Sequence, residues 1–165
     1  MVTSNKDVVE KMTEDWVTYD IEIYDLETYH KNFLFADLNY FLEKLKFDLN
    51  KELNKLKNDR NFLFQLVKGS EKIFSGFGYL PVSYNNVINI LEVFASIDLF
   101  KVEIISKDNP VKFKILVNKI FFNLQKSNRV LALVLGNMNE EKMKEKFEHA
   151  IRTTYSKKFK VSIEK

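Results

Sequence analysis

The feature that most constrains this fold is the order of sequence patterns between Leu38 and Phe159. A leucine-rich helical pattern is followed by a glycine-turned hairpin pattern, an apolar helix, several β-branched strand runs and a capped amphipathic helix. Helix-period and strand-period segments that share one chain of 165 residues predict a mixed α/β (α+β) domain. We expect a single, mostly antiparallel sheet of five strands, in the order α-β-β-α-β-β-β-α, with helices packed on it.

Leucines at steps of three and four predict the first helix. Asp37 is its expected N-cap, because a side-chain carboxylate there can accept a bond from a free helical N–H. The same stripe could form a coiled coil, but it lasts under three heptads, so packing on the sheet is favoured. The stripe consists of Leu38, Leu42, Leu45, Leu49, Leu53 and Leu56.

The next two patterns are a hairpin and an unusually apolar helix. Phe62–Val67 and Lys72–Leu80 are the expected strands, and Gly69 supplies the conformational freedom that a tight turn needs. The helix Ser83–Ile97 is apolar on more than one face, which indicates burial on two sides. One side can be the sheet, and the other needs a covering segment or a second subunit.

Strand runs occupy the third quarter of the chain. Residues 101–106 form one predicted strand, and residues 111–126 form either one bent strand or two, because the apolar parity changes at Asn118-Lys119. Val130–Leu135 is apolar on both faces and is expected at the sheet centre. Asn137 is expected to begin the last helix, whose buried stripe is Met143, Phe147, Ala150, Ile151 and Tyr155.

Charge is distributed asymmetrically along the chain. Residues 7–28 hold eight acids and one base, a net −7, although the whole chain carries +3. With Lys6 counted separately, residues 29–165 therefore carry +9. We expect residues 1–36 to be an acidic extension of a domain spanning 37–165. The alternation from Val17 to Ile23 predicts either an added strand or a loosely docked acidic tail.

Composition narrows the functional classes. The absence of Cys excludes a disulfide framework and thiolate chemistry. No apolar run reaches the roughly 18 residues that span a bilayer, and no signal-peptide pattern opens the chain, so we expect a cytoplasmic protein. The 23 Lys against three Arg indicate an AT-rich genome. No catalytic, metal or cofactor motif is present, so we expect neither an enzyme nor a bound cofactor.

The basic body allows one alternative function. Lysines beside an exposed aromatic ring can bind a nucleic acid through phosphate contacts and base stacking. The scarcity of Arg, which makes most bidentate base contacts, favours a merely solvated face. The alternative is therefore a basic accessory protein that binds nucleic acid or a nucleoprotein complex. Its candidate residues are Lys112, Lys114, Lys119, Phe121 and Lys126.

The element order resembles that of the roadblock domain family, a relative of the longin and profilin-like folds. The resemblance is carried by the leucine helix, the hairpin at Gly69, the Ser83–Ile97 helix, the later strands and the last helix. It implies a non-enzymatic scaffold that forms homodimers, with sheets joined edge to edge, and that binds or regulates a small GTPase in signalling or trafficking assemblies. The expected interface residues are Val87, Leu91, Phe94, Val102 and Ile104. The acidic extension has no counterpart in that family and could cover the same surface.

Overall fold

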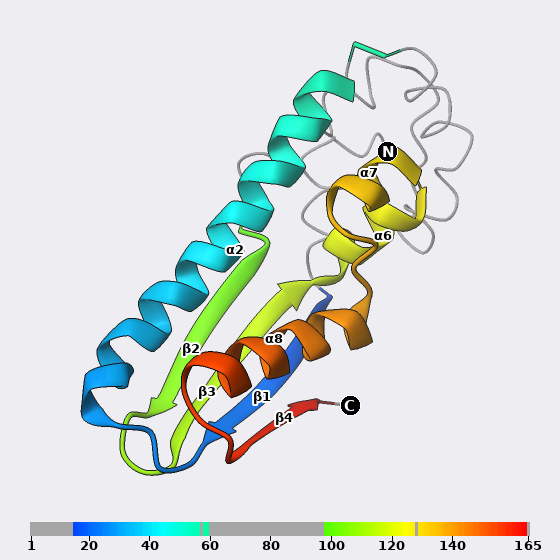
Figure 1. Ribbon diagram of the computed structural model, residues 1–165. Helices are drawn as coiled ribbons and strands as arrows, with labels where there is room; N and C mark the ends of the chain where they lie inside the picture. The colour runs from blue at the N-terminus through cyan, green and yellow to red at the C-terminus, as the bar shows by residue number, and fades with distance from the viewer. Residues whose placement is uncertain (1–14, 57, 60–97, 128, 165) are drawn as a thin grey trace, which may run out of the picture. The chain divides into compact units, whose positions relative to one another are not determined.

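A computed structural model of the chain describes residues 15–56, 58–59, 98–127 and 129–164 (Figure 1). The chain divides into two compact units. The sheet unit comprises Trp16–Leu45, Phe100–Val117 and Met138–Lys165. The helical unit comprises Met1–Asp15, Lys46–Leu99 and Asn118–Asn137. The boundary expected between residues 36 and 37 falls inside a continuous helix.

The sheet unit is built on a four-stranded antiparallel sheet with the strand order β2-β3-β1-β4. In the β2–β3 hairpin Val102 is opposite Ile115, and in the β1–β4 pair Ile21 is opposite Val161. The acidic alternating segment therefore joins the sheet, as a central strand rather than a docked tail. The strands are β1 (Trp16–Ile23), β2 (Phe100–Ser106), β3 (Val111–Asn118) and β4 (Phe159–Ile163).

The mixed α/β class and the antiparallel sheet are confirmed, whereas the predicted five strands and their order are not. The described residues hold four strands, and one of them, β4, follows the last helix. The lysine-rich segment that follows this helix therefore leads into this strand, and Lys160 lies within β4. The predicted hairpin strands Phe62–Val67 and Lys72–Leu80 lie outside the described residues.

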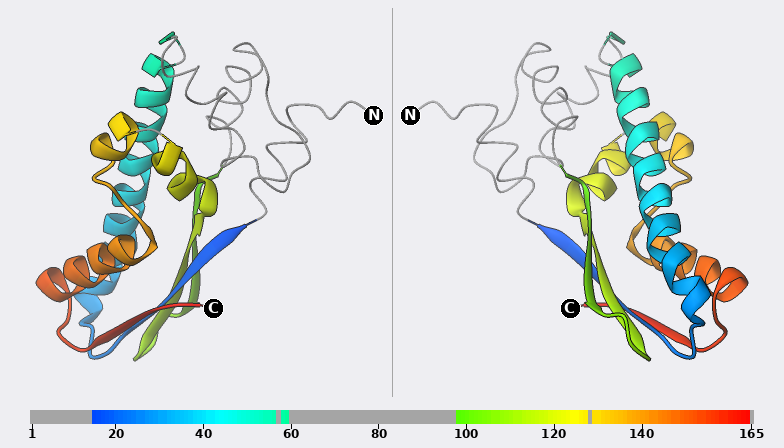
Figure 2. Two further views of the ribbon diagram at one scale, coloured as in Figure 1. Left: turned by 90° about the vertical axis from the view of Figure 1, so that its right-hand side faces the viewer. Right: turned by 90° about the vertical axis from the view of Figure 1, so that its left-hand side faces the viewer.

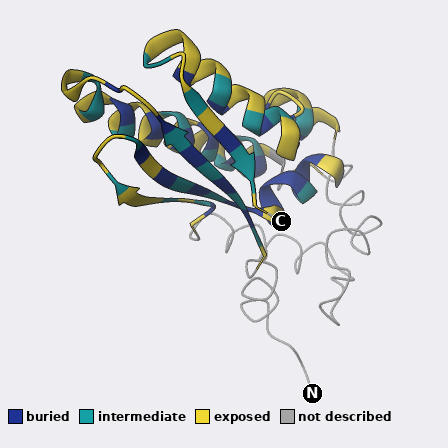
Figure 3. Cartoon of the chain, turned by 90° about the horizontal axis from the view of Figure 1, so that it is seen from below, coloured by how far each residue is buried: buried dark blue, intermediate teal, exposed yellow. Residues whose placement is uncertain are grey.

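One face of the sheet is covered by two helices, the first part of α2 (Thr28–Leu56) and α8 (Glu140–Thr154) (Figure 2). Every second residue of β1 and β3 turns toward these helices and is buried, as the period of two in each strand requires. Figure 3 shows the opposite arrangement on the helices, whose sides away from the sheet are exposed. The buried strand residues are Val17, Tyr19, Ile21, Ile23, Val111, Phe113, Ile115 and Val117.

Helix α2 begins nine residues before the predicted N-cap. Its first turn forms where the N–H groups of His30 and Lys31 donate to the carbonyl of Glu27, at 3.0 and 3.2 Å. Asp37 therefore lies inside the helix. The leucine stripe is buried as predicted from Leu38 to Leu53, and Leu34 extends it toward the N-terminus. Packing, rather than a single capping residue, decides where this helix starts.

Helix α8 begins after Asn139 rather than at Asn137. The side-chain oxygen of Asn139 accepts a 2.8 Å bond from the N–H of Lys142, which caps the first turn. Asn137 is instead a left-handed residue with φ 53° that follows Gly136. The predicted stripe is buried at Met143, Phe147 and Ile151, while Ala150 is exposed and Tyr155 is half-buried.

The helical unit corrects two strand predictions. Residues 119–126 form α6 (Lys119–Ser127) rather than a continuation of the preceding strand. The parity change marks this strand-to-helix junction, where the side-chain oxygen of Asn118 accepts a 3.1 Å bond from the N–H of Ile120. Residues 130–134 lie in α7 (Arg129–Val134) and not in a central strand. In that helix Leu131 is buried, whereas Val130 and Leu133 are 52% and 62% exposed.

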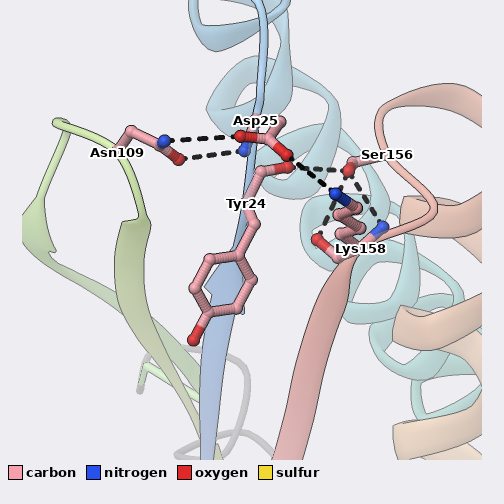
Figure 4. A network of polar contacts seen from close by, with 5 residues as sticks. All are labelled: Tyr24, Asp25, Asn109, Ser156 and Lys158. Atoms are coloured by element: carbon pink, nitrogen blue, oxygen red, sulfur yellow. Dashed lines mark hydrogen bonds and ion pairs between the residues drawn. The ribbon is translucent and has the colours of Figure 1, made fainter.

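Three connections of the sheet unit are joined by a polar network at one end of the sheet (Figure 4). Asn109, in the β2–β3 turn, accepts a 2.9 Å bond from the N–H of Asp25, which follows β1. The Asp25 carboxylate lies 3.4 Å from the ammonium of Lys158. Ser156 donates a 2.8 Å bond to the carbonyl of Tyr24. These contacts join the turn that precedes β3 to the turn that follows β1 and to the turn that precedes β4.

Candidate interaction surface

Strand β2 is the most exposed strand of the sheet. It pairs with β3 on one side, and no strand among the described residues pairs with its other side. Ile104 is 46% exposed and Ile105 is 59% exposed. An edge strand that carries exposed branched apolar residues is a ready template for pairing with another strand. The outer side of β2 is therefore the candidate interaction surface, called here the β2 edge and defined by Lys101–Ile105.

The register of the hairpin explains why both isoleucines are exposed. Ile104 is opposite Phe113, but the next pair joins Ser106 to Lys112, so Ile105 is an extra residue in β2. Such a bulge increases the local twist and ends regular pairing. The regular part of the β2 edge therefore stops at Ile104, and a paired strand would be limited to about four residues.

The structure brings together two of the five predicted interface residues. Val102 and Ile104 lie two positions apart on β2 and thus on the same face of the strand. Val102 is half-buried and Ile104 is exposed, as a partly open edge requires. Val87, Leu91 and Phe94 lie outside the described residues.

The five predicted nucleic-acid residues do not form one surface within a single unit. Lys112 and Lys114 lie on β3 in the sheet unit, whereas Lys119, Phe121 and Lys126 lie on α6 in the helical unit. The ring of Phe121 is fully buried, and an enclosed ring cannot stack on a base. The prediction of one exposed sheet region with an aromatic platform is wrong because the chain becomes helical after Asn118.

The two β3 lysines are engaged with acidic neighbours on the open face of the sheet. Lys112 lies 3.9 Å from Glu22, and Lys114 lies 3.7 Å from Asp20 on β1. Lys114 also pairs with Glu164 at 3.3 Å. The hydrogen bond to Glu164, together with the negative charges of Glu164 and Asp20, raises the pKa of Lys114. The acidic segment thus neutralises much of the basic character of β3.

One feature of the sheet unit was missed by sequence reasoning: an apolar groove between α2 and α8. Its cavity measures about 250 Å³. The signal was present in Ala150, a small residue within the predicted apolar stripe of α8, because a small side chain between larger ones leaves space. The groove is lined by Leu34, Asp37, Leu38, Phe41, Lys146, Phe147, His149, Ala150, Ile151 and Tyr155.

A hydrogen bond and a ring contact link α8 to α2 at Tyr155, which lines this groove. The hydroxyl of Tyr155 donates to the carboxylate of Asp37. Burial, followed by the bond to Asp37, raises the pKa of the Tyr155 phenol above its ordinary value. The Tyr155 ring also packs edge-on against His30, with centroids 5.8 Å apart. The end of α8 is therefore tied to the first turns of α2.

Aromatic side chains also lie on the side of α2 that turns away from the sheet. Tyr29, Phe33 and Tyr40 are 67%, 48% and 74% exposed. Their spacing of four and seven residues places them on one helical face, opposite the buried leucines. This face gives α2 an exposed aromatic surface, which the sequence analysis did not predict because it considered only the leucine stripe.

Comparison with known proteins identifies no relative. No protein-family model, curated protein or solved structure matches this chain. Across the described residues, no three His, Asp or Glu side chains gather as ligands for a metal ion. None of the described helices combines the length and apolar character needed to cross a membrane.

Proposed function

We propose that this protein is a protein–protein interaction module that forms a symmetric homodimer by pairing two β2 edges. The observation that carries the proposal is the exposure of Ile104 and Ile105 on a strand whose outer side pairs with no described strand. The resemblance to roadblock domains supports the same mode, since those domains join sheets edge to edge. Binding, rather than catalysis, is the proposed role.

Antiparallel pairing of two copies about Val102 gives a self-consistent register. Each Lys101 then lies opposite Glu103 of the second copy, and Val102 lies opposite its own counterpart. A two-fold axis repeats each pair, as an isologous interface requires. No like charges oppose each other in this register, and like charges opposite one another would destabilise the pairing.

Main-chain hydrogen bonds would supply much of the affinity, as in other cases of strand addition. The side chains of Val102 and Ile104 would lie on the face of the sheet that carries α2 and α8, and Lys101 on the other face. Lys101 already lies over the ring of Trp16, with 4.6 Å between its ammonium and the ring centroid. Because that contact holds the cation above its own sheet, the edge of β2 stays accessible to a second strand.

Sedimentation equilibrium of the wild type and of Ile104→Lys tests this proposal. We expect a concentration-dependent dimer for the wild type and a shift toward monomer for Ile104→Lys, because a charge at the edge disfavours strand pairing. Val130→Lys is the matched control, since Val130 is an apolar residue on α7 with 52% exposure. A wild type that remains monomeric at high concentration, or an Ile104→Lys variant that dimerises like the wild type, contradicts the proposal.

A small GTPase as a further partner is proposed from the resemblance alone. Its test is a titration of the full chain with small GTPases in their GDP-bound and GTP-bound forms. Binding that prefers one nucleotide state supports a regulatory scaffold. If the chain binds neither nucleotide state, the GTPase is removed from the proposal, and the proposed homodimer is not affected.

A further inference from the structure

We propose that the groove between α2 and α8 is a binding site for a small amphiphilic carboxylate, with its apolar body in the groove and its anionic head at the mouth. The proposal is independent of dimerisation, because the groove shares no residue with β2. Three observations support it: the apolar lining, the limited volume and the basic side chains on α8.

The lining selects an apolar body. Leu34, Leu38 and Phe41 form the α2 wall, and Phe147 and Ile151 belong to the α8 wall. Phe41 and Phe147 contact each other with centroids 6.2 Å apart, so the two walls are in contact at these rings. A hydrocarbon placed there is transferred from water to an apolar surface, and this transfer favours binding.

The volume limits the size of the ligand. A cavity of about 250 Å³ equals the volume of about eight water molecules, at roughly 30 Å³ each. An engineered apolar cavity of roughly 150 Å³ binds one benzene molecule, so this groove has room for a somewhat larger apolar body. A much longer chain would extend beyond a groove of this volume. Medium-chain carboxylates therefore fit better than long-chain ones.

Two basic side chains that line the groove select the charge of the ligand's head group. Lys146 and His149 lie three residues apart on α8, which places them side by side on the exposed surface. Within the described part of the chain, neither side chain forms an ion pair. The one carboxylate that lines the groove, Asp37, belongs to α2 and accepts the Tyr155 hydroxyl. An anionic head can pair with Lys146 and His149 on α8, whereas a cationic head would be repelled by Lys146.

Octanoate is the probe, and amide chemical shifts of the full chain in ¹H–¹⁵N spectra are the measurement. We expect saturable shifts at residues of α2 and α8 that line the groove. Ala150→Phe fills the groove from an exposed position and should weaken binding at least tenfold. Ala36→Phe, at another exposed alanine on α2 outside the lining, is the matched control and should bind like the wild type.

Head-group charge is tested with octanol and octylammonium. We expect octanoate to bind most tightly and octylammonium most weakly. Lys146→Gln should weaken octanoate about two- to fivefold, as for an exposed ion pair, and leave octanol unchanged. Lys144→Gln, on the same helix outside the lining, should change neither. The proposal is overturned if octanoate causes no shifts, or if Ala150→Phe binds octanoate as tightly as the wild type. Equal binding of octanoate and octylammonium would also overturn it.

Discussion

The hydroxyl of Tyr19 donates a 2.7 Å hydrogen bond to the main-chain carbonyl of Glu140, which lies 121 residues further along the chain. The bond joins the central strand β1 to the first turn of α8. The Tyr19 ring also packs edge-on against Phe147, two turns along the same helix, with centroids 5.2 Å apart. A residue of the acidic N-terminal segment is therefore a principal anchor of the helix layer.

Replacement of Tyr19 by Phe tests this anchor. The Phe ring keeps the contact with Phe147 but removes the buried hydroxyl, so we expect the free energy of unfolding to fall by about 1 kcal/mol. Chemical denaturation monitored by circular dichroism measures the change. Tyr24→Phe is the matched control, because its hydroxyl bonds to Glu22 at the surface, and we expect a change below about 0.5 kcal/mol. Equal effects of the two substitutions would contradict the anchoring role of Tyr19.

Stability should fall at alkaline pH because Tyr19 resists ionisation. Burial, followed by the negative charges of Glu140 and Glu141, raises the pKa of the Tyr19 phenol above its ordinary value of 10.0. Above about pH 10 the unfolded chain loses this proton while the folded chain retains it, so the free energy of unfolding decreases as pH rises. Denaturation midpoints measured from pH 8 to about pH 11 should show a steeper fall for the wild type than for Tyr19→Phe.

We expect the buried Phe147 side chain to contribute far more to the free energy of unfolding than an exposed aromatic side chain does. Phe147 is buried between Tyr19 and Phe41, so Phe147→Ala should lower the free energy of unfolding by about 3–5 kcal/mol. Phe33→Ala makes the same chemical change on α2 at a side chain that is 48% exposed. We expect its effect to stay below about 1 kcal/mol in the same denaturation experiment. Similar losses in the two variants would show that the helix layer is packed differently.

Charge reversal on β3 tests the ion pairs of the open sheet face. Lys114→Glu would place a carboxylate beside Asp20 and Glu164, and we expect a lower thermal midpoint than in the wild type. Added salt should narrow this difference, because it screens exposed charges. Lys119→Glu is the control, since Lys119 is exposed on α6 and has no ion pair within the described residues. A deficit of Lys114→Glu that is independent of salt would point to a loss of packing instead.

Periodicity predicted the parts of the fold in which one face of an element is buried. The leucine stripe of α2, the stripe of Met143, Phe147 and Ile151 on α8, and the strands β2 and β3 were predicted from the sequence, although the predicted strand region 111–126 ran on past the end of β3. Each alternation or helical repeat has a single arrangement that buries its apolar side. Val102 and Ile104 were predicted as interface residues, and both lie on the candidate interaction surface. Their place at a sheet edge could not be predicted, because it depends on which strands pair.

Local sequence patterns gave wrong predictions where contacts with other segments decide the secondary structure and the burial of a residue. Val130–Leu135 has strand-like composition but lies largely in the short helix α7, in which Val130 and Leu133 are exposed. A short apolar run has no period that separates a buried strand from a helix. Likewise, Phe121 was expected at the surface beside lysines, but the helix α6 directs its ring into the core.

The sequence by itself determined which faces are apolar, where the acidic and basic segments lie, and that strands and helices share one chain. Only the tertiary structure decided that Val17–Ile23 lies centrally beside β3, that its acids neutralise Lys112 and Lys114, and that α2 and α8 enclose a groove. The reason is physical: periodicity is a property of neighbours along the chain. Strand order, ion pairing and cavities instead depend on contacts between segments that are distant in the sequence, such as Tyr19 and Glu140, which are 121 residues apart.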